Sequence, residues 1–297
     1  MSIDNLRIYV TVVEQKNFSK AAKLLNLSQP NVSLHIRNLE NEFEATLLHR
    51  SPKQVKVTEE GKILYIKAKQ MLSLYDEAKQ EMNDRKNIVQ GTIKIGASFT
   101  IGEYILPKLL AEYARENRGV TVEVTVANTE EVIERIRSND LDVGLVEGEV
   151  ANADVEVQPF MEDEMIMIAP ANHTLAQLKV VKPEMLQEEV WIWRESGSGT
   201  RAYSDRFMQE LNLNVKHSFI FSSSQGIKEA VSEGLGIAMI SKWTVRKELQ
   251  AGTIKRLNIN NRKFARHFSL VQSKNPGYSK AHQLFIVKIE GADRFFD

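Results

Sequence analysis

The feature that most constrains the fold of this 297-residue chain is a change of hydrophobic period near residue 91. Before that point, apolar residues recur at the three- and four-residue spacing of amphipathic helices. After it, short apolar or alternating runs such as 92–97 and 120–126 alternate with helical stretches such as 129–139. Strands that alternate with helices predict a parallel sheet with crossover connections. We therefore expect an α/β chain of two or three folding units, with a helical N-terminal part.

Composition restricts the class of protein further. Lys+Arg and Asp+Glu both number 39, so the total charge gives no indication of a partner, although residues 1–90 carry three more basic than acidic side chains. The absence of cysteine excludes disulfides, thiol nucleophiles and Cys-ligated zinc. No apolar run reaches the roughly 18 residues that span a bilayer, and the N-terminus is unlike a signal peptide. We expect a cytoplasmic protein without a membrane partner.

The first sixty residues predict three short helices. Apolar residues recur at helical spacing over 3–13. We expect Ser19 to cap a second helix and Ser28 to cap a third, because Ser is a preferred N-cap residue. Pro30 is tolerated in the first turn of that third helix, where its missing N–H has no helical partner.

The third helix has two faces of different chemistry. At about 100° per residue, Val32, Ile36, Leu39 and Phe43 fall together and predict a buried stripe. Two short helices joined by a tight turn, the second with a largely uncharged polar outer face, are typical of a helix-turn-helix. The outer face and its flanks consist of Pro30, Asn31, Ser33, Leu34, Arg37, Asn38 and Asn41.

These side chains suit DNA bases. Gln and Asn can pair with adenine, Arg with guanine, and an apolar side chain such as Leu34 can contact a thymine methyl group. The alternative is an ordinary amphipathic helix with a solvated face, and the helical wheel alone leaves both interpretations open. The stretch 47–58 favours DNA, because its two short extended runs and the basic residues Arg50, Lys53 and Lys56 predict a hairpin that can lie on the phosphate backbone.

The segments FSKAAKLLNLSQPNVSLHIRNLE and LLHRSPKQVKVTEEG resemble the winged helix-turn-helix of LysR-type transcriptional regulators. The resemblance covers about the first 65 residues, and the order of AA, LSQP, S, I, LE, R and TxxG makes it specific. It implies a transcription factor that binds promoter DNA, with a C-terminal sensor domain and no cofactor. By position, Gln29, Pro30 and Ser33 would face the bases, whereas Ser28 and Arg50 would lie near phosphates. Leu34, His35 and Lys53 depart from common family residues, which affects individual base contacts rather than the fold. The expected DNA-binding residues are Ser28, Gln29, Pro30, Asn31, Ser33, Leu34, Arg37, Arg50 and Lys53.

A long helix follows, with Thr58 as its expected N-cap. Leu64, Ala68, Met71, Tyr75, Ala78 and Met82 recur at heptad spacing. Such a seam can pack on its own domain or against a second chain. Two-fold DNA sites favour a two-fold protein, and in the resembling family this helix is the dimerisation linker. We expect a homodimer or homotetramer, with a hinge in NIVQGT (87–92).

Beyond residue 91, two successive sets of strands and helices indicate two similar subdomains. The resemblance implies a periplasmic-binding-protein-like sensor in which the chain crosses between lobes near residues 162 and 267. We expect a winged helix-turn-helix domain over 1–57, a linker helix over 58–89 and a two-lobed effector-binding domain over 90–297. Lobe 1 would comprise 90–162 and 268–297, and lobe 2 would comprise 163–267.

Three strand-to-helix junctions are candidates for the effector site: ASFT (97–100), RESGSGTR (194–201) and FSSSQG (221–226). Gly permits close approach of the backbone, hydroxyls donate hydrogen bonds, and a helix N-terminus favours an anion. Ligands of such sheets bind beyond the C-terminal ends of the strands. The alternative is that these loops are only N-caps and turns. Arg201 or Arg194 could add a cation. The expected effector-binding residues are Ser98, Phe99, Thr100, Ser196, Gly197, Ser198, Gly199, Thr200, Arg201 and Ser223.

The loop RESGSGTR also resembles its counterpart in family members that govern sulfur assimilation and carbon fixation. This resemblance favours the branch that regulates cysteine metabolism in Gram-positive bacteria. It implies activation of a metabolic operon, a small anionic metabolite as effector, and RNA polymerase as a candidate partner.

Catalytic interpretations find little support. GSGTR lacks the ending of a phosphate-binding loop, no Ser has Gly at both −2 and +2, and the six His form no i, i+4 pair for a metal. We expect neither an enzyme nor a metal protein. The competing hypotheses are a small-molecule binding module with vestigial DNA binding, and an enzyme on the binding-protein fold.

Overall fold

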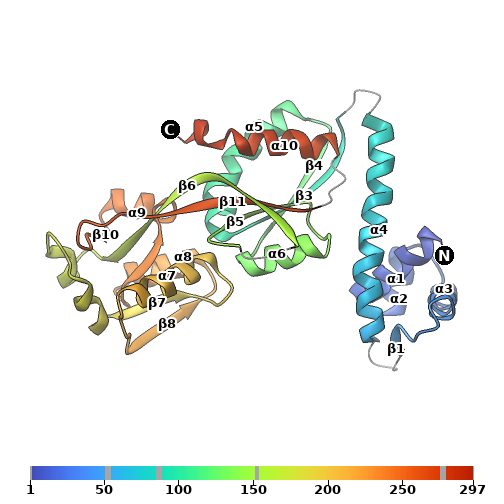
Figure 1. The fold of residues 1–297 in the computed structure, drawn as a ribbon, viewed down its shortest axis with the longest axis horizontal. Coiled ribbons are helices and arrows are strands. Elements are labelled where there is room, and N and C mark those ends of the chain that lie inside the picture. The colour runs from blue at the N-terminus through green and yellow to red at the C-terminus, as the bar shows by residue number, and fades with distance from the viewer. Residues whose placement is uncertain (1, 51–54, 85–88, 151–153, 275–278, 297) are drawn as a thin grey trace. The chain divides into compact units, whose positions relative to one another are not determined.

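The computed structural model describes residues 2–50, 55–84, 89–150, 154–274 and 279–296. These residues form two compact units, one that extends from the N-terminus to about residue 87 and one that begins at about residue 88 (Figure 1).

The N-terminal unit begins with three helices packed around one core. They are α1 (Ile3–Gln15), α2 (Phe18–Leu24) and α3 (Gln29–Glu42). The apolar stripes that the sequence predicts face inward, because burying them removes apolar surface from water. The buried side chains of this core include Leu6, Tyr9, Val12, Ala21, Ala22, Val32, Ile36 and Leu39.

The predicted N-caps are confirmed at Ser28 and Thr58 but not at Ser19. The Ser28 hydroxyl accepts a hydrogen bond from the Asn31 N–H at 3.3 Å, so Ser28 caps α3 as predicted. The prediction of Ser19 as the cap of α2 is wrong. Asn17 has this role, because its side-chain oxygen accepts from the Lys20 N–H at 2.9 Å and α2 starts one residue before Ser19.

Phe43 does not join the buried stripe of α3. The helix ends at Glu42, and Phe43 is its C-cap with a side chain that is 44% exposed. The prediction that Phe43 is buried assumed that the helix continues through residue 43, one residue beyond its actual end.

A two-stranded wing follows α3. Strands β1 (Leu48–Arg50) and β2 (Val55–Val57) pair antiparallel, and the predicted turn at 51–54 lies outside the described residues. The carboxylate of Glu40 accepts hydrogen bonds from the backbone N–H groups of Leu47 and Leu48 at 3.1 and 3.3 Å. This acid therefore holds the wing against α3.

The long helix α4 (Glu59–Asp84) starts after Thr58, whose hydroxyl accepts from the Gly61 N–H at 2.9 Å. The predicted heptad seam divides into two faces. Leu64 and Ala68 are buried, together with Leu72, in the core of the N-terminal unit. The first residues of the seam therefore pack on their own domain, which is one of the two interpretations that the sequence left open. The later apolar residues Met71, Leu74, Tyr75 and Met82 are exposed.

Lobe 1 of the C-terminal unit contains the predicted parallel βαβαβ arrangement. Strand β3 (Gly91–Ala97) lies between β4 (Val120–Val126) and β5 (Val143–Glu147) and runs parallel to both. Helix α5 (Leu106–Glu116) connects β3 to β4, and α6 (Thr129–Arg137) connects β4 to β5. Helix α10 (Lys280–Glu290) packs beside α5 in the same lobe (Figure 1).

Two long antiparallel strands connect the lobes. The whole of strand β11 (Phe264–Ser273) pairs with residues 155–165 of β6 (Val155–Pro170), and β11 also pairs with β5 in lobe 1. In lobe 2, β6 pairs with β9 (Ala238–Ser241) and β10 (Ile254–Leu257), which completes a seven-stranded sheet. Figure 1 shows β6 and β11 passing from one lobe to the other.

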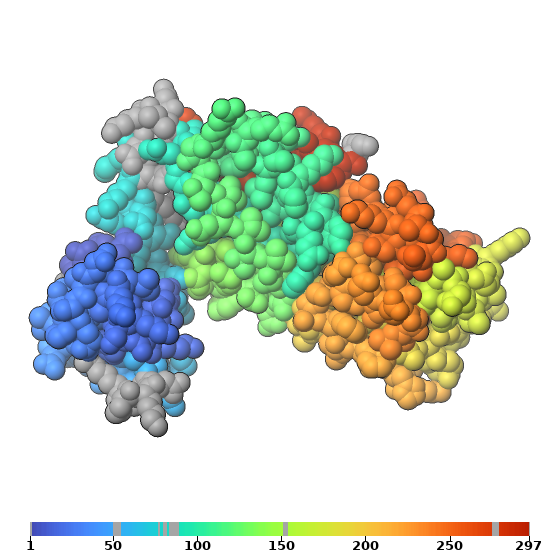
Figure 2. Space-filling model, turned by 180° about the vertical axis from the view of Figure 1, so that it is seen from behind, coloured from blue at the N-terminus to red at the C-terminus, as the bar shows by residue number. Residues whose placement is uncertain are grey.

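Lobe 2 repeats the α/β pattern on a smaller scale. Strands β7 (Val190–Arg194) and β8 (His217–Phe221) are parallel, and α7 (Gly199–Glu210) connects them. Helix α8 (Ser224–Ser232) follows β8, and α9 (Arg246–Ala251) precedes β10. Figure 2 shows lobe 1 in green and lobe 2 in yellow and orange, with a constriction where the lobes meet. The described residues of the C-terminal unit also include short non-α helical turns: η1 (Ile101–Ile105), η2 (Thr174–Gln177), η3 (Pro183–Glu188), η4 (Lys242–Val245) and η5 (Ala292–Phe295).

Candidate functional site

The outer face of α3 is open to solvent. Gln29, Pro30 and Asn31 are exposed at its N-terminus, Leu34 is 54% exposed and Arg37 is exposed one turn further on. This row of donors and acceptors, with the apolar Pro30 and Leu34 among them, is a surface that can read base edges from a major groove.

Hydrogen bonds organise the first turn of this face. The Gln29 side-chain amide donates to the Ser33 hydroxyl at 2.9 Å, which holds the amide along the outer surface of α3. Ser28 is engaged as the N-cap of the helix, and its hydroxyl remains exposed. Arg50 ends β1, but its side chain, like the whole of Lys53, lies outside the described residues.

The second candidate site lies between the lobes of the C-terminal unit. The three predicted loops follow the C-terminal ends of β3, β7 and β8, as expected for parallel strands. Ser98 and Thr100 are buried, and a π-helical turn, η1, follows them directly. Such turns are rare and frequently lie at functional sites.

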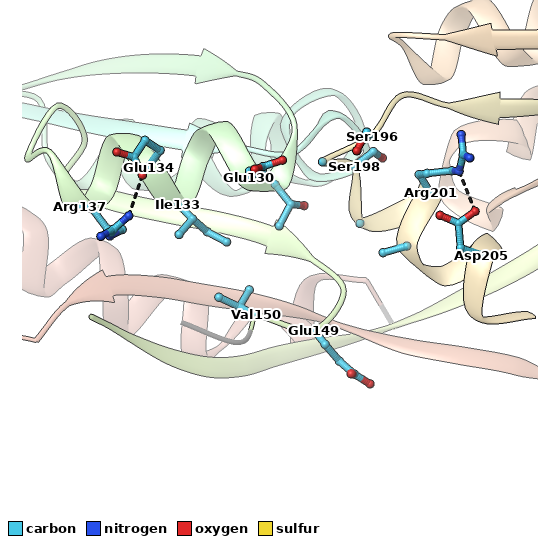
Figure 3. A pocket seen from close by; sticks show the side chains of 14 residues that line it. Glu130, Ile133, Glu134, Arg137, Glu149, Val150, Ser196, Ser198, Arg201 and Asp205 are labelled. Atoms are coloured by element: carbon cyan, nitrogen blue, oxygen red, sulfur yellow. Dashed lines mark hydrogen bonds and ion pairs between the residues drawn. The ribbon is translucent and has the colours of Figure 1, made fainter. Parts of the chain in front are cut away.

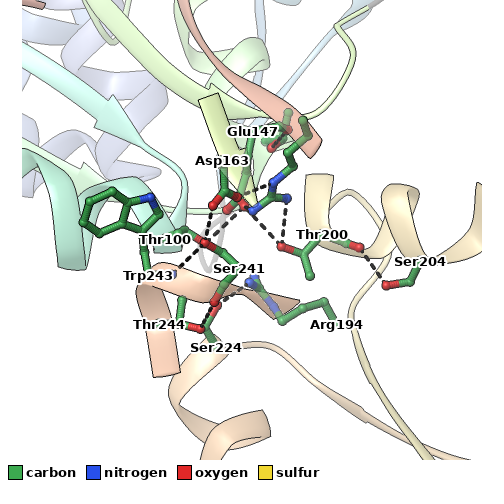
Figure 4. A network of polar contacts seen from close by, with 12 residues as sticks. Thr100, Glu147, Asp163, Arg194, Thr200, Ser204, Ser224, Ser241, Trp243 and Thr244 are labelled. Carbon is green, nitrogen blue, oxygen red and sulfur yellow. Dashed lines mark hydrogen bonds and ion pairs between the residues drawn. The ribbon is translucent and has the colours of Figure 1, made fainter. Parts of the chain in front are cut away.

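Loops from opposite lobes converge on one carboxylate. The hydroxyls of Thr100, in lobe 1, and Thr200, in lobe 2, each donate to the same carboxylate oxygen of Glu147 at 3.1 Å (Figure 4). Glu147 is the last residue of β5 and is 1% exposed. The two candidate loops therefore share a buried acid that the sequence analysis did not select.

Arg266 supplies the positive charge beside this acid. Its guanidinium forms an ion pair with Glu147 and donates from Nε to the Asp163 carboxylate at 2.7 Å. Asp163 and Arg266 face each other across the pair of strands β6 and β11. Arg266 also donates to the Thr200 hydroxyl at 3.2 Å, and the Ser241 hydroxyl donates to Asp163 at 2.6 Å. The network thus joins lobe 1, the crossover strands and lobe 2.

The two acids of this network respond differently to their surroundings. Burial raises the pKa of Glu147, but the attraction of Arg266 and Arg194 and side-chain hydrogen bonds together outweigh burial and leave that pKa below its ordinary value. Burial also raises the pKa of Asp163, and there Arg266 compensates only in part, so this pKa lies above its ordinary value. Both acids pair with Arg266, and their surroundings favour the charged form of Glu147 more than that of Asp163.

Ser98 completes the lobe 1 side of the site. Its hydroxyl is buried beside Glu147 but has no partner at hydrogen-bonding geometry among the described residues. An unpaired buried hydroxyl costs free energy, so a ligand that supplied an acceptor at this position would gain a hydrogen bond.

Arg194 places its cation against lobe 1, and Arg201 lines the groove between the loop 196–199 and α6. The Arg194 side chain is 1% exposed, forms two hydrogen bonds of 2.8 Å to Glu195, and lies 4.5 Å from the centre of the Phe99 ring. Phe99 belongs to lobe 1, so this cation–π contact joins the lobes. Arg201 instead donates to Asp205 at 2.8 Å on its own helix.

The Gly residues of the loop 196–199 allow the lobes to approach closely. A Cβ at Gly199 would lie 1.9 Å from the Glu147 carbonyl oxygen. Gly197 has a φ of +84°, a conformation that L side chains rarely adopt, and its carbonyl accepts from the Glu130 N–H at 3.1 Å. Any side chain at Gly199 would force lobe 2 away from lobe 1.

On its outer side, the same loop borders a groove of about 430 Å³ against α6. Figure 3 shows Ser196 and Ser198 on one side of this groove and Glu130 and Ile133 of α6 on the other. Ser223, the remaining predicted residue, accepts from the Gly226 N–H at 3.1 Å. Ser223 is thus the N-cap of α8, and its contact with an effector stays a prediction.

The described part of the chain contains no group of three or more acidic or His side chains placed to bind a metal ion. None of the helices in the described ranges has the length and apolar composition needed to cross a membrane.

A winged helix-turn-helix joined to a two-lobed domain with a polar site between its lobes defines a ligand-responsive transcription regulator. Residues 3–62 match the model of bacterial regulatory helix-turn-helix proteins of the lysR family, and residues 86–290 match the LysR substrate binding domain. The chain therefore belongs to the LysR family of transcriptional regulators and is not an enzyme.

Individual relatives agree with this assignment. The chain is 46% identical over 290 residues to the HTH-type transcriptional regulator CysL of Bacillus subtilis, covering 98% of this chain and 97% of that protein. A full-length OxyR variant of Pseudomonas aeruginosa has a similar fold, with a TM-score of 0.78 at 22% identity over 97% of this chain and 94% of that OxyR chain. The regulatory domain of Synechocystis CcmR, solved in complex with 2-PG, gives a TM-score of 0.64 at 26% identity over 68% of this chain and 97% of that domain.

Proposed function

We propose that this regulator activates an operon of sulfur assimilation in response to a small anionic metabolite bound between the lobes of its C-terminal unit. The observation that carries the proposal is the convergence of Thr100 and Thr200, from opposite lobes, on one buried acid. The pathway assignment is supported by the loop RESGSGTR and by the 46% identity with CysL.

The anionic character of the effector is supported by the donors at the site. Hydroxyls of Ser98, Thr100 and Thr200 and the buried cations Arg194 and Arg266 all lie near Glu147, an acid that Thr100, Thr200 and Arg266 hold by direct contacts. A bound carboxylate or phosphate would take over the hydroxyl donors from Glu147. The complex of the CcmR regulatory domain with 2-PG is a precedent in a relative.

The proposed mechanism is a population shift. An effector that contacts both lobes favours one lobe arrangement over the other by its difference in affinity. That change would alter the spacing of DNA-binding domains in an oligomer, and hence promoter occupancy or a contact with RNA polymerase.

On DNA, we propose that Gln29, Pro30, Asn31, Ser33, Leu34 and Arg37 face the bases while Ser28, Arg50 and Lys53 contact phosphates. The exposure of the α3 face supports this assignment. A promoter-binding protein acts where the chromosome is, so we propose a cytoplasmic location.

We further propose that residues 58–89 form a dimerisation linker between the DNA-binding domain and the effector-binding domain, whose lobes comprise 90–162 with 268–297 and 163–267. The apolar residues Met71, Leu74, Tyr75 and Met82 on α4 are exposed and lie within one side of the helix. A homodimer that covers them could read the two halves of a two-fold promoter site, alone or as part of a homotetramer.

Electrophoretic mobility shifts at several salt concentrations test the DNA-binding proposal. We expect the full-length protein to prefer its own promoter region over random DNA of equal length, and affinity to fall as salt rises. Equal affinity for both DNAs at every salt concentration would favour the alternative of a small-molecule binding module with vestigial DNA binding.

Thermal-shift measurements on the full-length protein test the effector proposal. We expect one class among small carboxylates, phosphates and sulfate esters to raise the melting temperature of the wild type but not of a Thr100→Val variant. Stabilisation by uncharged metabolites alone would contradict the anionic assignment.

A further inference from the structure

The two lobes of the C-terminal unit differ in charge. Residues 163–267, which comprise lobe 2, carry 15 Lys and Arg against 11 Asp and Glu. The rest of the unit, residues 91–162 and 268–297, carries 10 against 17. The total charge of the chain conceals this difference, because the basic excesses of residues 1–90 and of lobe 2 cancel the acidic excess of lobe 1. A local excess of positive charge indicates a partner of negative charge.

Five cations of lobe 2 lie on two adjoining segments, 179–182 and 255–263. The Val181 N–H donates to the Asn258 carbonyl at 2.7 Å, and the Asn260 N–H donates to the Val181 carbonyl at 3.3 Å, so the segments run side by side. Figure 1 shows the helical turns around residue 180 beside β10, at the end of lobe 2 that lies away from lobe 1. We call this surface the basic rim, and it consists of Lys179, Lys182, Lys255, Arg262 and Lys263.

A well-ordered turn presents part of the basic rim. Asn260 and Asn261 have φ values of 47° and 55°, in the left-handed region that Asn tolerates better than most residues. The Asn258 side chain fixes this turn, because its oxygen accepts from the Asn261 N–H at 3.0 Å and its amide donates to the Lys179 carbonyl at 3.0 Å. Arg262 follows directly, so this turn keeps the backbone of both segments in one place.

The basic rim lacks counter-ions. Its five side chains are exposed and form no ion pair within the described ranges, whereas their neighbour Arg256 pairs with Glu164 at 2.6 Å. Of the acids in the adjoining turn η3, Glu188 pairs with Lys216 at 2.8 Å, and Glu184 is exposed without an ion pair to any described residue. Five uncompensated cations thus lie near one uncompensated acid.

Protection of a sheet edge explains only part of this charge. Strand β10 pairs with β6 alone, and a cation on such an edge strand prevents it from pairing with another sheet. Lys255 lies on β10, but the other four cations lie outside the strands of the sheet. Their charge therefore points to a partner.

The chemistry of the basic rim suits a phosphate backbone better than an acidic protein surface. Interfaces between proteins are depleted in Lys and depend on aromatic anchors, whereas interfaces with DNA are strongly positive and polar. Four of the five cations are Lys, and the segments 178–182 and 255–263 contain no aromatic residue. Their exposed apolar side chains are the aliphatic Leu178 and Val180.

We propose that the basic rim is a second DNA contact, which binds the phosphate backbone outside the stretch that α3 and the wing recognise. The proposal rests on the proposed DNA binding by the N-terminal unit, because a few exposed cations bind phosphates only weakly by themselves. Once α3 holds a duplex, the neighbouring phosphates of that duplex are present at a high effective concentration. A contact with phosphates adds affinity without sequence preference.

The basic rim would also connect DNA binding to the arrangement of the lobes. All five cations belong to lobe 2, so a change in the arrangement of the two lobes would move them relative to lobe 1. An effector could therefore change the contact with flanking DNA without changing base recognition by α3.

Fluorescence anisotropy of the full-length protein with labelled promoter DNA and with random DNA of equal length, over a series of salt concentrations, tests the proposal. The variant Lys179→Gln/Lys182→Gln/Lys263→Gln should bind both duplexes about tenfold or more weakly than wild type, with an unchanged preference for the promoter. The slope of log affinity against log salt should fall by about 1–3, because each lost phosphate contact removes about 0.9 from it.

Two further variants are the controls. Lys94→Gln/Arg115→Gln/Arg118→Gln removes the same number of charges from exposed positions of lobe 1 and should bind DNA as wild type does. Lys179→Arg/Lys182→Arg/Lys263→Arg keeps the charge of the basic rim and should restore the affinity and the salt dependence. All of these side chains are exposed, so circular dichroism should show an unchanged fold.

Hydroxyl-radical footprints on the promoter locate the contact. The Gln variant of the basic rim should lose protection of flanking phosphates and keep the central protection that α3 and the wing provide. Wild-type affinity and salt dependence in this variant would overturn the proposal, and so would an equal loss in the lobe 1 control.

The outcomes also separate this proposal from its alternatives. Unchanged DNA binding by the Gln variant, together with reduced transcription in vitro, would assign the basic rim to an acidic surface of RNA polymerase instead. Equal affinity of wild type for promoter and random DNA would contradict base recognition by α3, whereas the change in salt dependence on random DNA would still decide whether the basic rim binds phosphates.

Discussion

At the scale of single residues, the two candidate sites differ in how they hold their polar groups. On α3 the polar side chains are exposed and held only by local bonds such as Gln29 to Ser33. Between the lobes, Glu147, Asp163 and Arg266 are buried and hold one another. Substitutions on α3 should therefore affect recognition, whereas substitutions in the network should affect stability as well.

Gln29→Ala should loosen base preference, because it removes a donor and an acceptor that can read a base edge, at a cost of about 1–3 kcal/mol at the preferred site. Arg50→Ala should weaken binding to all sequences and flatten the salt dependence. Competition mobility shifts with promoter and random DNA distinguish these outcomes. Identical behaviour of the two variants would contradict the separation of base-reading and phosphate-binding residues.

The opposite pKa shifts of Glu147 and Asp163 predict opposite pH dependences. The pKa of Glu147 is lowered on folding, so its contribution to stability is present at higher pH and is lost as pH falls through the folded-state pKa. The pKa of Asp163 is raised, so its contribution is present at low pH and is lost as pH rises through its folded-state pKa.

Chemical denaturation at a series of pH values that extends below 4.5, the ordinary pKa of a Glu carboxyl, and above 3.8, that of an Asp carboxyl, measures this difference. The gap in unfolding free energy between wild type and Glu147→Gln should widen as pH rises, and the gap for Asp163→Asn should narrow. Gaps that change in the same direction would show that the two acids are not held as the buried geometry indicates.

At the scale of elements, α4 serves two surfaces. Its Leu64, Ala68 and Leu72 face the core of the N-terminal unit, whereas Met71 and Leu74 face solvent. A stripe of exposed apolar residues on a long helix is a candidate surface for association with another chain.

Leu64→Ala should destabilise the N-terminal unit by about 2–5 kcal/mol, because it leaves a cavity in a packed core. Leu74→Glu should leave the unfolding free energy of the protomer nearly unchanged but weaken self-association. Sedimentation velocity measures the self-association of both variants, and chemical denaturation measures their unfolding free energies. A Leu74→Glu protein that associates as tightly as wild type would exclude this stripe as the interface.

At the scale of the whole molecule, the C-terminal unit is built so that one polar network spans both lobes and the strands that join them. Thr100 and Thr200 contact the same oxygen of Glu147 although they are separated by 100 positions in the chain. A ligand at this point would influence both lobes at once.

Thr100→Val and Thr200→Val should each leave DNA affinity close to the wild-type value while reducing the effector-induced change in binding, because each removes one hydroxyl donor from the site. Ser198→Ala, at the N-cap of α7, should act in the same direction. Fluorescence anisotropy with labelled promoter DNA, with and without effector, measures both quantities. Loss of DNA binding itself in these variants would contradict the separation into two modules.

Local patterns determined much of this architecture. The helical period over 3–43, the Ser28 and Thr58 caps and the alternation of strands and helices after residue 91 each depend on residues within a few positions of one another. Such patterns act through backbone geometry and apolar periodicity, which are properties of the sequence alone. The winged helix-turn-helix and the position of the three loops after their strands were therefore predictable.

Only the tertiary structure decided which residues meet between the lobes. Asp163 and Arg266 are 103 positions apart and become partners through the register of β6 against β11, which no local period specifies. The sequence thus determined the elements and the exposed helix, whereas long-range strand pairing decided which charges are buried together, because burial of a charge requires a partner that only the folded chain can provide.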